Sequence, residues 1–357
     1  MPPGNPLHTR LCDLLGIRVP IVQTGMGWVA TPELVAAASN AGAFGFLAAA
    51  TIPPPAVEAA IARVQALTDR PFGVNFLMDA PGADVISEAI VRRGVRAAGY
   101  NRSPDRKLIA RLKAAGVLCI PTCGAPRHVE KAVELGADAV IAQGGEGGGH
   151  TGTIPTSLLV PACTALVDAP IIAAGGFKDG RGLVAALAWG AAGIAMGTRF
   201  LLTAESPVPS VTSDRYLEAG LADVVVTNEI DGLPQRVIVN ELLRRLEAAG
   251  PLTKLWLAFR SAVELRSVTG ASPLALLRTA LALRKNERLT RSQLVMAANA
   301  PILAKRAMQD GDPVHGYLPS GSVAGLIDDR PTCAALIERI MHEAEQTLKR
   351  LSLGSAS

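Results

Sequence analysis

Aromatic and charged residues are both scarce in this chain. Phe, Trp and Tyr make up 4% of its 357 residues, and Asp, Glu, Lys and Arg together make up 18%. A disordered chain carries more charge than this, and a surface that binds nucleic acid has basic residues interleaved with aromatic ones. The net charge of +4 is mild for this length, and 49% of the residues are hydrophobic. We therefore expect a folded protein with an aliphatic core that does not bind nucleic acid.

Long apolar runs, a leader and paired cysteines are also lacking. Charges or prolines interrupt every stretch of about 18 residues that a membrane span would need. The N-terminus has no basic region followed by an apolar stretch, as a secretion signal would. Five cysteines form no CxxC pair, namely Cys12, Cys119, Cys123, Cys163 and Cys333. These absences predict a cytoplasmic protein without a membrane segment, with reduced, buried thiols and no bound metal.

One pattern is repeated between residues 19 and 203. Short β-branched and apolar runs alternate with Ala- and Leu-rich helical stretches, for example 31–41, 54–66, 104–115, 126–135 and 179–189. The eight runs are 19–23, 44–48, 72–75, 95–98, 117–121, 139–143, 170–174 and 193–196. Eight such units in series predict an α/β fold, a closed (β/α)₈ TIM barrel. An open α/β sheet is the alternative.

Cap residues mark the ends of the predicted helices. Thr31, Ser103 and Asp179 are candidates for side-chain caps at helix starts, with Pro32 and Pro104 at the first helical position. Glycines that supply a left-handed cap follow the helix ends at 42, 116 and 136.

The repeated pattern stops after Phe200. We expect a barrel over 1–205, an inserted, mostly helical lid or substrate subdomain over 206–320, and a segment 321–357 whose helix 332–350 completes the outer ring. The subdomain has a strand-like run at 224–230 and helical stretches at 241–249 and 273–284. Residues 254–306 hold ten Lys or Arg and only two acids. This excess of positive charge fits either a solvated helix face or a surface that binds a polyanionic part of the substrate, such as a nucleotide phosphate.

Two glycine turns lie where the last two predicted barrel strands end. In a TIM barrel the active site is at this edge, and phosphate commonly binds after strands seven and eight. Gly175 and Gly176 follow the seventh run, and Gly197 and Thr198 follow the eighth. They predict a ligand that carries phosphate, since glycine amides are unobstructed by side chains and Thr198 adds a hydroxyl. Two tight turns without a ligand are the alternative.

A glycine-rich stretch follows the sixth predicted strand. Six of the ten residues from Gln143 to Gly152 are glycine, and Glu146 and His150 lie among them. Glycines let the backbone approach a flat ligand, and histidine exchanges protons near neutral pH. The other four histidines lie in terminal segments, on a predicted helix surface or in a Pro/Gly turn. His150 is therefore the predicted catalytic residue, with a structural loop histidine as the alternative.

These features together resemble the nitronate monooxygenase (2-nitropropane dioxygenase) family of FMN enzymes. The motifs that carry it are the two glycine turns predicted to bind phosphate, Asn75 in Phe-Gly-Val-Asn-Phe and the glycine-rich stretch that ends in His150. The resemblance covers essentially the whole chain and includes the segment Gly-Ser-Val-Ala-Gly at 321–325, which is similar in kind to flavin-dependent enoyl-acyl-carrier reductases. It implies bound FMN. The cofactor-binding residues that it implies are Gln23, Thr24, Gly25 and Met26 along one flavin edge, Asn75 and Gln143 on the ring, Gly148 and Gly149 in the glycine-rich stretch, and Gly175, Gly176, Gly197 and Thr198 on the phosphate.

The first strand departs from the family pattern. Nitronate-oxidising members usually have Pro before the Met that follows this strand, and this chain has Gly25 before Met26. The stretch is more similar to flavin dehydrogenases that act on coenzyme A thioesters in steroid-ring breakdown. A thioester dehydrogenase is therefore the predicted activity, with a nitronate monooxygenase that uses O₂ or a flavin-dependent enoyl-thioester reductase as alternatives.

All these activities oxidise or reduce an activated carbon through flavin N5, with His150 as acid or base. Trp28, Glu146 and Arg284 are the residues predicted on the substrate side. The expected partner is a small molecule, in the favoured interpretation a coenzyme A thioester, and a homodimer is left open. A flavin-free barrel lyase or isomerase, or a barrel that only binds a ligand, would instead be colourless.

Overall fold

The computed structural model describes residues 5–101, 104–248 and 291–353. They form two compact units. The first comprises the chain up to residue 147, residues 151–207 and the chain from 327 onward, and the second comprises 148–150 and 208–326. The sequence-based division placed the inserted subdomain at 206–320 and assigned residues 148–150 to the barrel.

The first unit is built on eight parallel strands that close into a barrel. Each strand pairs with the next along the chain, and the last pairs with the first. The strands are β1 (Ile21–Gln23), β2 (Phe44–Ala48), β3 (Gly73–Phe76), β4 (Ala97–Asn101), β5 (Leu118–Cys123), β6 (Val140–Gln143), β8 (Ile171–Ala174) and β9 (Gly193–Met196). Each overlaps one of the eight predicted runs, so the predicted TIM barrel is confirmed.

Two phenylalanines fill much of the barrel interior. Phe44 and Phe46 lie two residues apart on β2 and therefore share a face, and their rings meet edge to face at 5.1 Å. Gly73 and Gly99 on the neighbouring strands leave room for the Phe46 ring, which a Cβ at Gly73 would strike. The two rings pack with aliphatic side chains of the other strands, among them Val22, Ile120 and Ile172.

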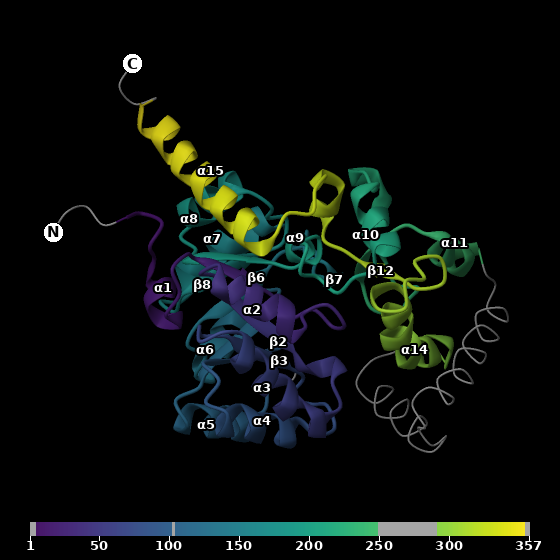
Figure 1. Ribbon diagram of the computed structural model, residues 1–357, viewed down its shortest axis with the longest axis horizontal. Coiled ribbons are helices and arrows are strands. Elements are labelled where there is room, and N and C mark those ends of the chain that lie inside the picture. Colours follow the sequence, from purple (N-terminus) through teal and green to yellow (C-terminus); the bar gives the residue numbers. More distant parts are fainter. Residues whose placement is uncertain (1–4, 102–103, 249–290, 354–357) are drawn as a thin grey trace. The chain divides into compact units, whose positions relative to one another are not determined.

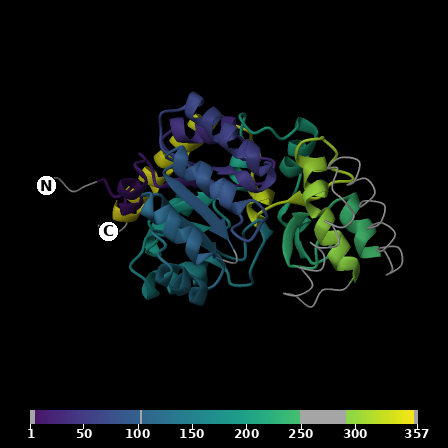
Figure 2. The same cartoon turned by 90° about the horizontal axis from the view of Figure 1, so that it is seen from below.

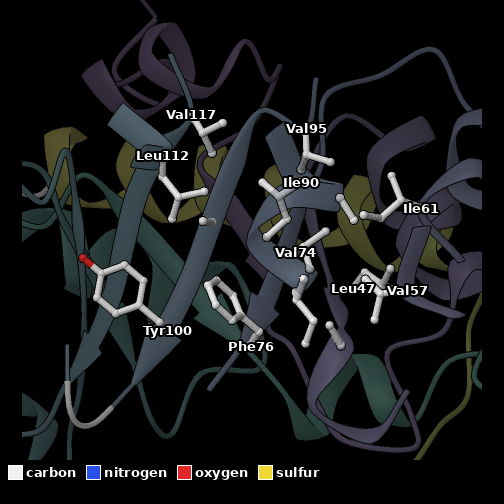
Figure 3. Close-up of a cluster of buried hydrophobic side chains, with 14 of the residues drawn as sticks. Leu47, Val57, Ile61, Val74, Phe76, Ile90, Val95, Tyr100, Leu112 and Val117 are labelled. Carbon is white, nitrogen blue, oxygen red and sulfur yellow. The ribbon is translucent and has the colours of Figure 1, made fainter. Parts of the chain in front are cut away.

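Helices surround the strands (Figure 2). They are α1 (Arg10–Leu15), α2 (Pro32–Asn40), α3 (Val57–Leu67), α4 (Ala83–Arg92), α5 (Arg106–Ala114), α6 (Pro126–Glu134), α7 (Thr156–Leu166), α8 (Gly180–Ala188), the short α9 (Thr198–Leu201) and α15 (Cys333–Leu353), with 3₁₀ turns at Ala49–Thr51 and Pro54–Ala56. Figure 3 shows aliphatic side chains between β3 or β4 and α3 to α5, among them Val74, Ile90 and Leu112. This burial holds the helices on the sheet.

Helix α15 packs along α8 (Figure 1). The Glu343 carboxylate accepts a hydrogen bond from the Gly180 amide at 2.9 Å. A Cβ at Gly180 would strike the Ala344 backbone, so the two helices cross at a distance that only glycine permits.

Some of the predicted caps are wrong. Asp179 does cap α8 by accepting from the Gly182 amide, and Pro32 does open α2, but Thr31 makes no side-chain cap. Pro104 is not the first residue of α5: that helix starts at Arg106, where Asp105 accepts from two backbone amides. The cap is thus Asp105, two residues after the predicted cap Ser103, and Ser103 itself lies outside the described residues. The three glycine caps at 42, 116 and 136 have positive φ, as expected.

The second unit contains a small antiparallel sheet that the sequence analysis did not predict beyond one strand. Strand β11 (Gln235–Ile238) pairs with β10 (Val224–Thr227), β12 (Leu318–Pro319) and β7 (Gly149–His150). The other elements described are α10 (Ser210–Leu217), α11 (Glu241–Ala248), α14 (Arg291–Met308) and 3₁₀ turns at Leu221–Asp223 and Ser322–Leu326. The helix predicted at 273–284 lies outside the described residues.

No helix within the described ranges is both long and apolar enough to cross a membrane. All five cysteines are buried and unpaired with one another. Burial raises the pKa of the Cys123 thiol to about 12, so this group is not a nucleophile at neutral pH. Within the described residues, no three His, Cys, Asp or Glu side chains gather as a metal site would require.

A buried arginine beside the β9 turn gives a first prediction. The Arg199 guanidinium is 2% exposed and pairs with Asp329 at 2.9 Å, which also binds Arg339 at 2.6 Å. The hydrogen bond from Arg339 and the charge of Arg199 lower the pKa of Asp329. Asp329→Asn is expected to cost about 2 kcal/mol at pH 7, between the values for exposed and buried pairs, because it leaves Arg199 without its counter-charge.

The pH dependence of this pair has a definite sign. Because the folded-state pKa of Asp329 is lowered, its stabilisation is present above the ordinary value of 3.8 and is lost as the pH falls through the lower folded-state pKa. Thermal melts should therefore separate wild type from Asp329→Asn at pH 7, and the difference should narrow as the pH is lowered toward 3. Equal melting temperatures at pH 7 would show that the pair contributes nothing.

Candidate active site

The residues predicted along one flavin edge lie together where β1 ends. A Cβ added at Gly25 would lie 2.5 Å from the Cβ of Asn75 on β3. A Cβ at Gly197, directly after β9, would lie 3.2 Å from Thr24 Oγ1 and 3.4 Å from Met26 Sδ. Three strand ends therefore bring Thr24, Gly25, Met26, Asn75 and Gly197 to one edge of the barrel.

Gln23, the last residue of β1, carries a buried polar atom without a partner. Its side chain is fully buried. The amide nitrogen donates to the Thr24 carbonyl oxygen, and Oε1 has no hydrogen-bond partner among the described residues. A buried acceptor without a partner costs free energy. This edge therefore suits a ligand that brings a hydrogen-bond donor.

A second group of predicted residues lies at the ends of β6 and β8. A Cβ at Gly147 would lie 2.6 Å from Gln143 Nε2, and one at Gly175 would lie 3.0 Å from the Gly147 nitrogen. Gly175 and Gly176 have φ values of +104° and +84°, which side chains rarely adopt. Because Gly147, Gly175 and Gly176 have no side chains, the backbone of this turn is not covered by side-chain atoms at these positions.

Glu146 is used within this turn. Its Oε2 accepts hydrogen bonds from the Thr156 amide at 2.8 Å and the Thr156 hydroxyl at 2.7 Å, at the start of α7. The sequence analysis placed Glu146 on the substrate side and missed Thr156. In the structure the Glu146 carboxylate links the glycine-rich stretch to the start of α7. The Glu146 Cβ lies 3.5 Å from the position that a Cβ at Gly176 would take.

His150 and the two glycines before it belong to the second unit. His150 forms strand β7 with Gly149 and lies directly opposite Gln235 on β11. Its Nε2 is 2.7 Å from Asp231 Oδ2, and the side chains are 49% and 9% exposed respectively. A Cβ at Gly148 would lie 2.6 Å from the Gly321 nitrogen. The histidine at the end of the glycine-rich stretch is thus held by sheet pairing.

Asp231 and Gln235 were missed by the sequence analysis. Asp231 lies four residues before Gln235, the first residue of β11. In the sequence it is followed by Gly232, and an Asp-Gly pair most simply predicts a turn. Its carboxylate also accepts from Gln235 Nε2 at 2.6 Å and from the Leu233 amide at 3.0 Å. Despite its burial, the hydrogen bond and charge of His150 lower the pKa of Asp231, so the group is an anion at neutral pH.

The remaining substrate-side predictions fall in two places. Trp28, in the turn after β1, has φ +65°, a strained value for a residue with a large side chain. Its amide donates to Thr51 Oγ1 at 3.2 Å, which holds the strained turn against the end of β2. Arg284 lies outside the described residues, as does most of the basic stretch 254–306.

A family model described as nitronate monooxygenase matches residues 8–98 and 84–343. The chain belongs to the nitronate monooxygenase family. Members of this family are flavoproteins, and the chain is an oxidoreductase. The resemblance noted in the sequence is thereby confirmed at the level of the family.

Two relatives carry the name (3aS,4S,5R,7aS)-5-hydroxy-7a-methyl-1-oxo-octahydro-1H-indene-4-carboxyl-CoA dehydrogenase. The protein from Rhodococcus jostii is 48% identical over 345 residues, covering 97% of this chain and 98% of its own. The one from Mycobacterium tuberculosis is 49% identical over 349 residues with the same coverage. Among solved structures, FabK from Thermotoga maritima is 32% identical, with a TM-score of 0.78 over 96% of this chain and 98% of its own.

The barrel edge fits a flavin. The unpartnered Gln23 Oε1 is an acceptor for a donor such as a flavin ring N–H. Gly25 and Gly147 bring backbone so close to Asn75 and Gln143 that a side chain would displace the two amides. Backbone amides at a turn of positive-φ glycines are a common anion site. The donor set at these strand ends is therefore of the kind that holds a planar ring with a phosphate tail.

Proposed function

We propose that this protein is an FMN-dependent dehydrogenase of an alicyclic carboxyl-coenzyme A thioester. The observation that carries the proposal is the similarity, over 97% of the chain, to two relatives named as dehydrogenases of a hydroindane carboxyl-CoA. The similarity extends over nearly the whole of this chain and of each relative, so it includes both the barrel and the second unit. The reaction class, dehydrogenation of a carboxyl-CoA thioester, is the one stated in the names of those relatives.

The turn after β1 gives structural support. Nitronate-oxidising relatives usually carry Pro where this chain has Gly25. A Cβ at this position would lie 2.5 Å from the Asn75 Cβ, so any side chain here would move Asn75. The backbone of this turn is therefore built for glycine.

The cofactor is proposed to be FMN, with its ring on the amides of Asn75 and Gln143 and its phosphate at Gly175, Gly176, Gly197 and Thr198. Releasing the chromophore by denaturation and weighing it by mass spectrometry tests this assignment. We expect FMN at about one per chain. FAD, which carries a further nucleotide, would contradict it.

His150 is proposed as the proton-exchanging residue. It follows Gly147 in the chain by three residues, and its imidazole is half exposed. A carbon next to a thioester carbonyl is acidic, and His150 removes or returns its proton. When bound, the flavin supplies the redox chemistry by accepting two electrons from the substrate. Asn75 and Gln143 orient the ring, and Glu146 fixes the turn that carries it.

A true nitronate monooxygenase is the second candidate, because the matching family model carries that description. Steady-state rates separate the two. We expect kcat/KM for a hydroindane carboxyl-CoA thioester, measured with an artificial electron acceptor, to exceed that for propionate 3-nitronate with O₂ by at least about 100-fold, the contribution of one catalytic group. The reverse order would replace the dehydrogenase proposal with nitronate oxidation.

A further inference from the structure

We infer that Asp231 is a positioning residue that holds the His150 ring in one orientation with its proton on Nε2. The inference rests on the proposed role of His150 as the proton-exchanging residue. It adds a partner that lies 81 residues away in the chain.

The Asp231 carboxylate is fully engaged around the histidine. Oδ2 receives His150 Nε2 at 2.7 Å and Gln235 Nε2 at 2.6 Å, and Oδ1 receives the Leu233 amide at 3.0 Å. With 7% of its surface exposed, Asp231 is buried, whereas half of the His150 side chain is exposed. A buried carboxylate thus anchors a side chain whose other portion remains accessible to solvent.

The local fold places the three side chains together. His150 and Gln235 are direct cross-strand partners in the antiparallel pair β7–β11, so their side chains share a face. Asp231 comes from the β10–β11 connection, where Gly232 has φ +86° and its amide bonds to the Asn228 carbonyl. The Leu233 amide then fixes the carboxylate from the same turn.

The pattern of donors settles the position of the proton. An ionised carboxylate only accepts hydrogen bonds. The Nε2 atoms of Gln235 and His150 are 3.4 Å apart, and each lies within hydrogen-bond distance of Oδ2, which can only accept. His150 Nε2 therefore carries a proton when it meets the ionised Asp231 carboxylate. Histidine orientation by a carboxylate in this way favours one tautomer and stabilises the imidazolium.

Gln235, which also donates to Asp231, is neutral. Burial and the nearby charge of Asp231 raise the pKa of Tyr317, so that phenol is also neutral at ordinary pH. Arg236 is opposite Gly149, and alternation along β11 points its side chain to the face opposite that of Gln235. Asp231 is thus an anion in direct contact with the imidazole.

Asp231→Asn tests the inference, because it keeps the shape and removes the charge. We expect kcat to fall about 100-fold or more, as when the aspartate of a histidine pair is replaced. KM should change little. The histidine-dependent limb of the pH–rate profile should move to lower pH, because the imidazolium loses its counter-charge. Asp231→Glu should recover part of the rate.

Asp312 provides a matched control in the same unit. Its carboxylate also binds a histidine, His315 Nδ1 at 3.0 Å, and accepts the Val314 and His315 amides. Asp312→Asn should leave both kcat and the pH profile unchanged. If the two variants behaved alike, the effect at Asp231 would reflect general destabilisation and the inference would be wrong.

Two further results separate the inference from the proposed function. If His150→Ala itself retained full activity, the proposed role of His150 would fail. If His150→Ala abolished activity while Asp231→Asn kept the wild-type rate and pH profile, only the positioning role of Asp231 would fail. A readout without turnover is the ring ¹⁵N spectrum of the wild-type protein near pH 8. It should show His150 as the Nε2–H tautomer, and an Nδ1–H tautomer would overturn the inference even where Asp231→Asn does not fold.

Discussion

His150→Asn should lower turnover by about 10²–10⁴-fold while the protein keeps its flavin, because it removes the proton-exchanging group and leaves the barrel edge intact. The residues proposed to hold the cofactor lie on β1, β3, β6, β8 and β9 of the first unit, and His150 is on β7 of the second. Asparagine keeps a polar side chain at this position, and β7 joins β11 through the backbone, so the β7–β11 pairing should survive.

The measurement is kcat with a coenzyme A thioester, together with the flavin absorbance per chain. His342→Asn is a suitable control, because His342 lies exposed on α15 and bonds Gln346 at 2.7 Å. Near-normal turnover in His150→Asn would remove this residue from the mechanism. Loss of flavin would instead assign it a role in binding the cofactor.

Gly175→Ala should lower the affinity for flavin by at least about tenfold, the equivalent of 1.4 kcal/mol. The added methyl would lie 2.9 Å from Thr156 Oγ1 and 3.0 Å from the Gly147 nitrogen, so the turn that we propose holds the phosphate must shift. The backbone would also be strained, because φ at this position is +104°.

Gly116→Ala separates strain from displacement. Gly116 also has positive φ, +74°, but no atom lies within 4 Å of an added Cβ. Both variants therefore lose about 1–2 kcal/mol of stability from the left-handed backbone, and only Gly175→Ala should lose flavin. Isothermal titration of the apoprotein with FMN gives the two affinities. Equal affinity in both variants would mean that the β8 turn does not touch the cofactor.

The barrel was predictable because its signals are local. Each strand is a run of buried apolar residues followed within a few positions by a helix with its own boundaries, and eight repeats leave few ways to fold. The residues at strand ends, such as Asn75 and Gly197, could be placed on one edge by the rule that parallel strands end on the same side. The proline at 104 misled because Asp105 is the stronger helix start.

The second unit was not predictable in the same way. Strands β7 and β12 have two residues each, too few for alternation to be recognised. The pairing of His150 with Asp231 spans 81 residues and depends on β7 joining β11, which no local pattern indicates. Glu146 was predicted on the substrate side because, in the sequence, its neighbours are glycines and offer its carboxylate no side-chain partner. Its partner, the amide and hydroxyl of Thr156, becomes visible only once α7 has formed.

An anaerobic absorbance titration of the purified protein tests the central claim most directly. We predict a yellow protein whose flavin band bleaches within seconds upon addition of about one equivalent of a hydroindane carboxyl-CoA thioester, and stays intact with propionate 3-nitronate. Bleaching by the nitronate alone would contradict the thioester assignment, and a colourless protein that gains no band when incubated with FMN would contradict the proposed flavin site itself.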